Sequence, residues 1–473
     1  MSIAYKIEFD NSQEIIFSEL ITKVFDELMK CGQEIVKDYL EKADDKILSE
    51  RDKKRYRCKG IRKTAVKTKL GVIEYDRRIY FDNENHKHTF LLDENIPAQK
   101  IGLVDNEMCS SISDMICIMS YRKVAETITE TTGLDISHNA VWDIVQKQGE
   151  KKIEETEKLS KLLSQNKLVG NIGTKLLYEE ADGDWLKLQG KDRIKHGPSK
   201  EMKIGIAYDG VIYHPMKDGK VRRELDNKVA YASFETAGSF RKHKDAVIAA
   251  VYNVDEIELR IKNGDGAQWI QKNSDSDCIC VLDEYHRNKK ITECVRDKDI
   301  AENLRELLFS GQYQLLLDTI EAYMNSIEDT EQVNKLGELY HYYSENFEAL
   351  PDYYSRGISI PETRKPGVIH HARLGSMESN VFTIIGNRMK GGRACWSIKG
   401  GNNLAALLCS YHASQPSYSV ADHKIKQKPV LSASKIKETS GNGYETKQMH
   451  NIPSSMKWLR NIASIKPLAD LRF

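Results

Sequence analysis

The chain has 473 residues and an ordinary apolar fraction of 40%, but it contains no long apolar run. None of its apolar stretches approaches the roughly 18 to 20 residues that a membrane-spanning helix needs. Its first residues, Met-Ser-Ile-Ala-Tyr-Lys-Ile-Glu, lack the basic and then apolar order of a signal peptide. These absences predict a cytoplasmic protein that makes no use of a membrane.

Paired cysteines are absent as well. The nine cysteines are scattered and form no Cys-x-x-Cys pair, so neither a zinc knuckle nor a disulfide framework is indicated. The chain is also nearly neutral, with a formal net charge of +1, which taken alone argues against binding to nucleic acid. The distribution of that charge matters more than its sum.

Positive charge gathers in residues 51–69, where ten Lys and Arg side chains face one acid, Asp52. Such a block has two interpretations. It is a surface that binds phosphates, or it is a solvated surface or linker without a ligand. On the first interpretation the candidate DNA contacts are Arg55, Arg57, Arg62 and Lys63.

The length predicts two to four domains, because domains commonly run roughly 100 to 200 residues. We expect an amphipathic helical region at 1–50 that packs on its own domain or on a second copy, and a small basic β element at 51–100 with a strand at 71–80. A helix-turn-helix region at 101–165 follows. An α/β core at 166–295 and 366–410 is interrupted by an all-α insertion at 296–365, and a basic tail occupies 411–473.

Helical patterns at about 105–118 and 120–132, a turn at Gly133 and a long helix from Ser137 are typical of a helix-turn-helix unit, although many helical proteins contain such a turn. Ser137 is a credible N-cap. His138 and Asn139 then lie at the start of the second helix, where base edges are met. The expected inner face is Ala140, Val141, Ile144 and Val145, and Trp142 is expected in the core.

The central region contains five strand-like runs, at 175–182, 202–208, 228–234, 256–261 and 278–283, with a helix at 240–252 before the fourth. Three strands, a helix, a fourth strand, a short helix and a fifth strand give the order of the ribonuclease H-like fold, with a mixed sheet. From Arg296 to about Tyr354 the pattern is almost purely helical.

Three acids occupy recognisable contexts in this core: Asp182 ends the first strand, Asp265 follows the fourth, and Glu378 opens a helix whose packed face is expected to hold Glu378, Val381, Phe382 and Ile385. Two Asp and one Glu suit hard divalent cations. A pair of Mg²⁺ or Mn²⁺ ions activates water and stabilises the leaving oxygen in phosphodiester cleavage. Rival acids are Glu179, Glu180 and Asp184 beside Asp182, and Asp283 for Asp265.

Several motifs together carry a family resemblance: Glu-Glu-Ala-Asp-Gly-Asp-Trp from 179, Asn-Gly-Asp-Gly-Ala-Gln-Trp from 263, Asp-Glu-Tyr-His from 283, and Glu378 with Arg388-Met389 and Trp396-Ser397. They resemble the bacterial insertion-sequence transposases of the ISLre-two family, also grouped as an uncharacterised protein family and related to the Mutator-like transposases. The resemblance runs over most of the chain.

The resemblance implies that Asp182, Asp265 and Glu378 take the Asp-Asp-Glu metal-binding positions, which favours Asp265 over Asp283. Asp283 and His286 match a Cys-or-Asp, two residues, His motif and would support the site; the alternative is a helix cap and a surface histidine. Arg388 and Lys390 are candidate phosphate contacts or the solvated end of their helix.

The expected function is that of a DNA transposase. It would bind terminal inverted repeats, cleave by two-metal hydrolysis and join the freed 3′-hydroxyl to target DNA, as a homodimer or higher oligomer associated with the bacterial nucleoid. The alternatives are a helix-turn-helix regulator without catalysis and a ribonuclease H-like nuclease.

Overall fold

The computed structural model describes residues 16–96, 100–216, 219–271, 278–361 and 374–414, so nearly all of the predicted basic tail at 411–473 lies outside the described residues. The chain divides into two compact units, Met1–Glu150 and Lys151–Phe473. Of the helices in these ranges, none is both long enough and apolar enough to cross a bilayer.

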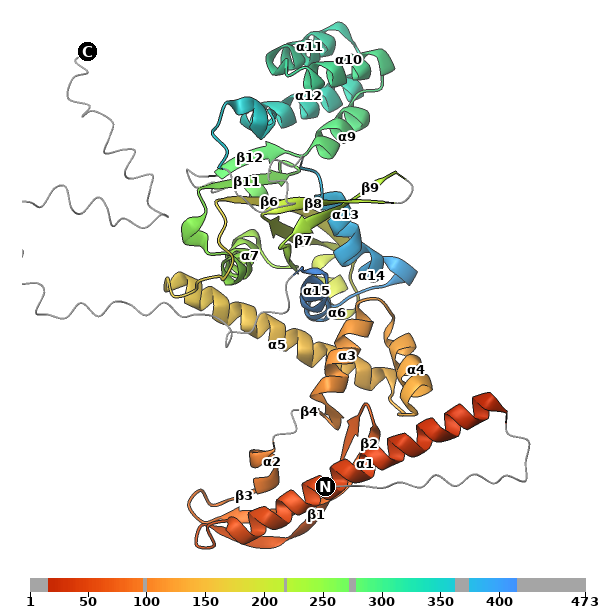
Figure 1. Cartoon of the computed structure of the whole chain (residues 1–473). Helices are drawn as coiled ribbons and strands as arrows, with labels where there is room; N and C mark the ends of the chain where they lie inside the picture. Colours follow the sequence, from red (N-terminus) through yellow and green to blue (C-terminus); the bar gives the residue numbers. More distant parts are fainter. Residues whose placement is uncertain (1–15, 97–99, 217–218, 272–277, 362–373, 415–473) are drawn as a thin grey trace, which may run out of the picture. The chain divides into compact units, whose positions relative to one another are not determined.

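In the first unit a long helix lies along a β-hairpin (Figure 1). Helix α1 is one continuous helix, and its C-terminal half packs Val36, Leu40 and Ile47 on a core that includes Ile73 and Tyr75. The strands form one sheet of order β3-β2-β1-β5-β4. The elements are α1 (Phe17–Glu50), β1 (Tyr56–Thr68), β2 (Gly71–Asp82), β3 (Lys87–Thr89), α2 (Leu91–Asn95), β4 (Lys100–Ile101) and β5 (Val104–Asp105).

Three helices follow the sheet, and each begins and ends within two residues of its predicted bounds where these were given: α3 (Asn106–Ile116), α4 (Tyr121–Thr132) and α5 (His138–Ser164). Gly133 ends α4 in the left-handed conformation, with a φ of 66°. The Ser137 hydroxyl accepts a hydrogen bond from the Ala140 N–H, at 3.2 Å. Val141 is buried as expected, but Trp142 is 50% exposed, so its assignment to the core was wrong. Neighbouring helical residues point about 100° apart, and Trp142 falls outside the packed stripe.

A five-stranded mixed sheet of order β10-β7-β6-β11-β12 lies at the centre of the second unit. The pairs β6–β7 and β7–β10 are antiparallel, whereas β6–β11 and β11–β12 are parallel. All five predicted strands are present; the hairpin β8–β9 was not anticipated. The elements are β6 (Leu176–Lys187), α6 (Gly190–His196), β7 (Ser199–Tyr208), β8 (Gly210–Pro215), β9 (Val221–Asp226), β10 (Val229–Ser233), α7 (Ala237–Val251), η1 (Val254–Glu256), β11 (Leu259–Gly264), α8 (Gln268–Gln271) and β12 (Cys278–Leu282).

The two faces of strand β6 have different neighbours. Leu177 packs with Val247 and Val251 of α7 on one face. Alternation along the strand turns Glu180, Asp182 and Asp184 to the opposite face. There Glu180 accepts hydrogen bonds from the backbone that leads into α13.

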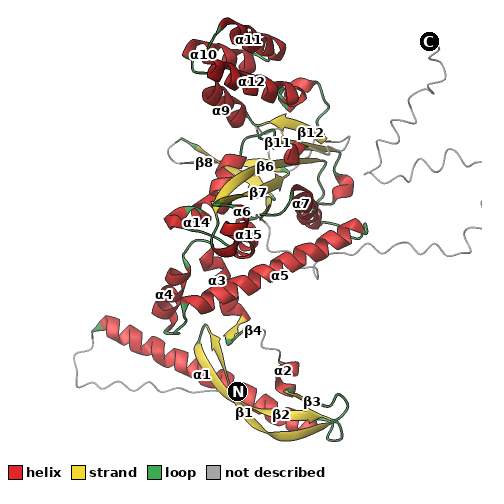
Figure 2. Cartoon of the chain, turned by 180° about the vertical axis from the view of Figure 1, so that it is seen from behind, coloured by secondary structure: helices red, strands yellow, loops and turns green. Residues whose placement is uncertain are grey.

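The segment predicted to be an all-α insertion is helical and has its own core, which includes Leu304, Leu316, Ile320, Leu336 and Leu339. Figure 2 shows its helices together beyond the β12 edge of the sheet. Asp297 and Asp329 cap two of them, and Asp283 caps the helix that precedes the predicted segment. The elements are α9 (Glu284–Cys294), α10 (Lys298–Phe309), α11 (Tyr313–Ser326), α12 (Thr330–Glu345), η2 (Phe347–Ala349) and η3 (Tyr353–Arg356).

The helix that carries Glu378 is rotated from its predicted position. Phe382 is 64% exposed, and the buried stripe begins at Met377 rather than at Glu378. The N–H groups of Gly375 and Ser376, just before this helix, donate to Glu180 and fix its start, and Glu378 is exposed beside the packed face. A π-helical turn continues the helix. The elements are α13 (Met377–Val381), η4 (Phe382–Gly386), α14 (Asn387–Met389), η5 (Gly391–Arg393) and α15 (Ile398–His412).

Candidate metal centre

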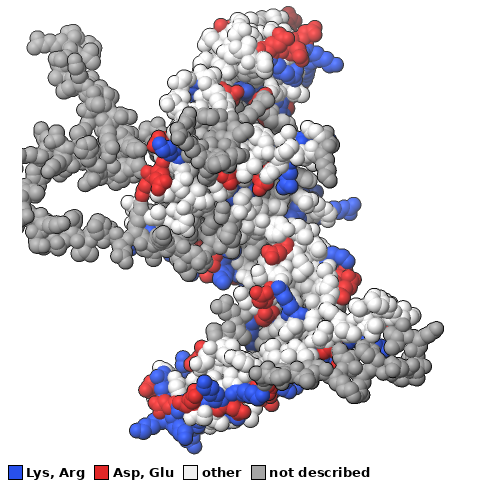
Figure 3. Space-filling model, in the orientation of Figure 1, with Lys and Arg blue, Asp and Glu red and all other residues white. Residues whose placement is uncertain are grey.

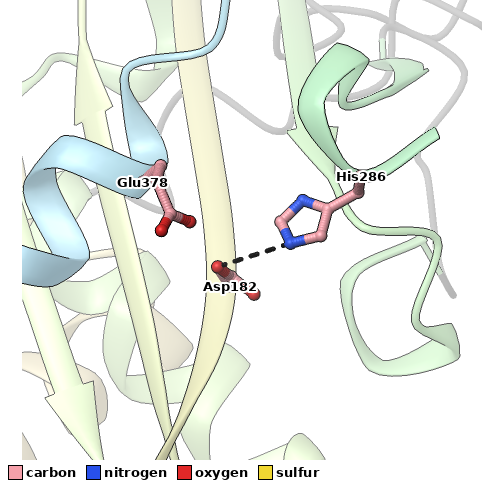
Figure 4. A group of neighbouring side chains, drawn as sticks. All are labelled: Asp182, His286 and Glu378. Atoms are coloured by element: carbon pink, nitrogen blue, oxygen red, sulfur yellow. Dashed lines mark ion pairs between the residues drawn. The ribbon is translucent and has the colours of Figure 1, made fainter. Parts of the chain in front are cut away.

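Three side chains from separate elements converge beside strand β6. Asp182 comes from β6, His286 from α9 and Glu378 from α13, and each points toward the other two (Figure 4). One potential ligand atom from each lies within 4.8 Å of the others. Opposite ligands of Mg²⁺ are about 4 Å apart, because each bond is about 2.1 Å long. The three ligand atoms would therefore have to move only slightly closer together to hold a divalent cation.

Asp182 is the most perturbed acid of the group. Its carboxylate is buried, and one oxygen accepts the N–H of Gly183 at 2.7 Å. Burial, together with the negative charges of Asp265 and Glu378, raises the pKa of Asp182 to about 6, although His286 and Gly183 oppose the shift. A buried carboxylate with so little compensating positive charge is a favourable place for a cation.

His286 is oriented by Asp283. The Asp283 carboxylate caps α9 by accepting the N–H groups of Tyr285 and His286, and it also lies 3.2 Å from His286 Nδ1. His286 Nε2 consequently faces Asp182, 3.9 Å from its Oδ2. Burial lowers the pKa of His286, but the hydrogen bond to Asp283 and the charge of Asp182 outweigh it and raise the pKa. Asp283 is thus a helix cap and also the partner of a half-buried histidine.

Asp265 is not in the group of three within 4.8 Å. Its Oδ1 accepts the N–H of Ala267 at 2.8 Å, which closes a tight turn, and its backbone carbonyl accepts the Tyr342 hydroxyl at 2.8 Å. Its charge nevertheless raises the pKa values of both Asp182 and His286, so it lies nearby. The hydrogen bond from Ala267 uses Oδ1 alone, and a role for Asp265 as a ligand stays a prediction.

Glu180 has a role that the sequence left open. It is buried, and its carboxylate accepts hydrogen bonds from the Tyr208 hydroxyl at 2.6 Å and the Asn263 amide at 3.0 Å. It also accepts the backbone N–H groups of Gly375 and Ser376, at 3.1 and 3.0 Å. Glu180 therefore ties β7 and β11 to the start of the helix that carries Glu378. The signal in the sequence was its place two residues before Asp182 on the same strand face.

The candidate phosphate contacts after Glu378 have partners within the protein. Lys390 forms an ion pair with Asp184, which is buried on the same face of β6 as Asp182. The Arg388 guanidinium lies 5.6 Å from the ring centre of Trp396. Lys390 thus helps to hold α14 against β6, and contact of either side chain with DNA stays a prediction.

The basic block of the first unit is partly neutralised. Arg55 pairs with Asp82 at 3.1 Å and with Glu84 at 2.8 Å, and Lys63 pairs with Glu74. Figure 3 shows acidic and basic side chains interleaved over the β1–β2 region. Arg57 and Arg62 are exposed. His138 and Asn139 are also exposed, in the first turn of α5, where a helix-turn-helix unit would meet base edges.

Comparisons with known proteins give a family but no activity. A UPF0236 protein of Caldanaerobacter subterraneus subsp. tengcongensis is 21% identical over 460 residues, which cover 95% of this chain and 90% of the relative. A second from the same organism is 23% identical over 385 residues, or 77% of this chain and 74% of the relative.

Among solved structures, the crystal structure of the Mos1 strand transfer complex matches 52% of this chain and 78% of its own chain. The identity is 10% and the TM-score 0.11, which is too low to carry an argument. The family model described as "Uncharacterised protein family (UPF0236)" matches residues 11–417. The chain therefore belongs to the uncharacterised protein family UPF0236.

Proposed function

We propose that this protein is a metal-dependent DNA transposase with a ribonuclease H-like core. The observation that carries the proposal is the convergence of Asp182, from the central strand, with Glu378, from a helix almost 200 residues later. The strand order β10-β7-β6-β11-β12 supports it, since three antiparallel strands are followed by two parallel ones. The motif resemblance to insertion-sequence transposases is the second support.

The side chains at the site suit two Mg²⁺ or Mn²⁺ ions held by Asp182, Glu378 and Asp265. Such ions would activate a water or a DNA 3′-hydroxyl and stabilise the leaving oxygen. Asp182 would contribute its carboxylate from the central strand, β6. Asp283 holds the imidazole of His286 toward Asp182, where His286 can donate a hydrogen bond to that carboxylate or to a DNA phosphate. Glu180 fixes the start of the Glu378 helix.

DNA recognition is assigned to the first unit. The exposed His138 and Asn139 open α5 after a short turn that follows α4, which fits recognition of terminal inverted repeats in a major groove. The exposed Arg57 and Arg62 on β1 can add phosphate contacts. Because two element ends must be cut together, we expect at least a dimer, active at the nucleoid.

Strand transfer separates this proposal from its rivals. Duplex DNA that carries the repeats flanking the gene is incubated with target plasmid and Mg²⁺ or Mn²⁺, using wild-type protein, Asp265→Asn and Glu378→Gln. A transposase joins element ends to the plasmid, and both variants bind the repeats without joining them. Cleavage without joining would favour the nuclease, and repeat binding with neither reaction would favour the regulator.

A further inference from the structure

An open groove with a volume of about 620 Å³ begins at the candidate metal centre and runs along α9. Its lining includes Tyr285, Asn288, Lys289, Arg305, Gly375 and Glu378. The residues from α9 recur at helical spacing and therefore share one face of the helix. Arg305 belongs to α10, so the all-α segment contributes a wall of this groove.

Charge changes sign along the groove. Asp283, Glu284 and Glu378 line the part next to Asp182, whereas Lys289 and Arg305 line the part farther along α9 and at α10. Arg305 is held in place because its Nη2 donates to the Thr292 hydroxyl at 3.0 Å. Lys289 forms a long ion pair of 4.0 Å with Glu293, and its side chain is 49% exposed. A ligand can therefore meet a metal-binding end and a cationic end in succession.

Tyr285 gives the groove an aromatic surface. Its side chain is 51% exposed although it lies between the buried Asp283 and the half-buried His286. The Lys289 ammonium lies 5.7 Å from its ring centre. An exposed ring beside a cation can stack on a nucleobase while the cation contacts a phosphate.

We propose that this groove binds an unpaired stretch of DNA next to the phosphate that is cut, with one base stacked on Tyr285 and phosphates on Lys289 and Arg305. The inference rests on the proposed function and assigns it a substrate-binding surface. Unpaired DNA fits better than duplex, because paired bases present their edges, not their faces, to a flat ring. An acidic peptide could use the two cations but would gain little from Tyr285.

Photo-cross-linking tests the groove without cleavage. A short single-stranded DNA that contains bromodeoxyuridine is irradiated with the full-length protein in EDTA, and the cross-linked peptide is identified by mass spectrometry. The expected cross-link lies at Tyr285. We expect Tyr285→Phe to retain it, and Tyr285→Ala to abolish it and weaken binding about tenfold, the worth of one stacked base. Lys289→Glu should weaken binding and reduce its dependence on salt.

Matched controls are Tyr213→Ala, which removes an exposed tyrosine of β8, and Lys335→Glu, on α12; neither residue lines the groove. Both should cross-link as the wild type does. Cross-links only at other peptides, equal cross-linking of a fully paired duplex, or an unchanged yield in Tyr285→Ala would each overturn the inference.

Nicking by the wild-type protein is measured separately in Mn²⁺. A protein that nicks DNA but does not cross-link at Tyr285 refutes the groove and leaves the proposed function standing. A protein that cross-links there but never nicks supports the groove and refutes the transposase.

Discussion

At the scale of single residues, Glu180 shows how a buried acid can serve a site without touching a ligand. Its carboxylate accepts two backbone N–H groups at the start of the Glu378 helix, so the position of Glu378 depends on it. Asp184 acts similarly at the other end, through its ion pair with Lys390. Strand β6 thus carries Glu180, Asp182 and Asp184 on one face. Glu180 and Asp184 hold the helical segment that places Glu378 near Asp182.

Replacing Glu180 should harm both stability and activity. Glu180→Gln puts an amide against N–H donors, and we expect the free energy of unfolding to fall by about 1–3 kcal/mol. Glu180→Ala removes the acceptor altogether and leaves several buried donors unpaired, so it should cost more than Glu180→Gln, about 3 kcal/mol or above. Chemical denaturation measures both values. The nicking rate of Glu180→Gln at saturating metal should fall while its affinity for DNA is retained.

The matched control is Glu258→Gln, which breaks an exposed ion pair with Lys175 and should change stability by less than about 0.5 kcal/mol. Equal stability and equal nicking for Glu180→Gln and Glu258→Gln would contradict the positioning role of Glu180.

His243 should make stability depend on pH. Its ring contacts Glu235 and Glu157, each at 3.0 Å, and the hydrogen bond to Glu235 raises the pKa of His243 although burial opposes the shift. This stabilisation is fully present below the unfolded pKa of about 6.5 and is lost as pH rises through the higher folded pKa. Thermal unfolding should show the wild type losing stability above pH 6.5 while His243→Gln changes less. Parallel curves for the two proteins would exclude the effect.

At the scale of elements, helix α1 has a clear internal repeat. Residues 21–41 read Ile-Thr-Lys-Val-Phe-Asp-Glu, Leu-Met-Lys-Cys-Gly-Gln-Glu and Ile-Val-Lys-Asp-Tyr-Leu-Glu, three heptads in succession. Ile21, Phe25, Leu28, Ile35 and Tyr39 form an exposed stripe with successive spacings of four, three, seven and four residues. A period of seven is typical of helices that pair with a copy of themselves, so we propose that α1 pairs with a second copy of this chain.

Leu28→Glu should separate the dimer. Burying a leucine contributes about 2 kcal/mol, and a symmetric dimer loses two, so its dissociation constant should rise at least about a hundredfold. Light scattering during gel filtration gives the mass. Lys30→Ala, on the same helix but outside the stripe, is the control and should stay dimeric. A wild type that is monomeric at micromolar concentration would rule out pairing through α1.

Many of the helices and strands could be predicted from the sequence. The five strands and α7 are short apolar runs bounded by polar residues, and the caps at Ser120 and Ser137 have the usual chemistry. The position of the Glu378 helix could not be predicted, because its start is held by hydrogen bonds to Glu180 from 195 residues away. Exposure of Trp142 was missed because an aromatic residue was assumed to be buried.

At the scale of the whole molecule, the candidate site draws on residues from three distant parts of the sequence, at 182, 286 and 378. The spacing of residues in the sequence could identify candidate acids. It could not show that His286 lies among them, nor that Asp265 accepts a hydrogen bond from Ala267 in its own loop. The second unit alone supplies all these groups. The exposed first turn of α5 and the α1 stripe belong to the first unit. The proposed DNA recognition and the proposed pairing of two chains therefore lie in a different unit from the proposed metal chemistry.

The most direct test is the rate of DNA nicking in Mn²⁺ by wild-type protein and by Asp182→Asn, with Asp297→Asn, a helix-cap variant outside the site, as the control. The account predicts metal-dependent nicking by the wild type and the control, and a loss of at least about a hundredfold in Asp182→Asn, since even indirect partners of a metal ligand are typically worth about 10- to 100-fold. Equal nicking by all three proteins would contradict it.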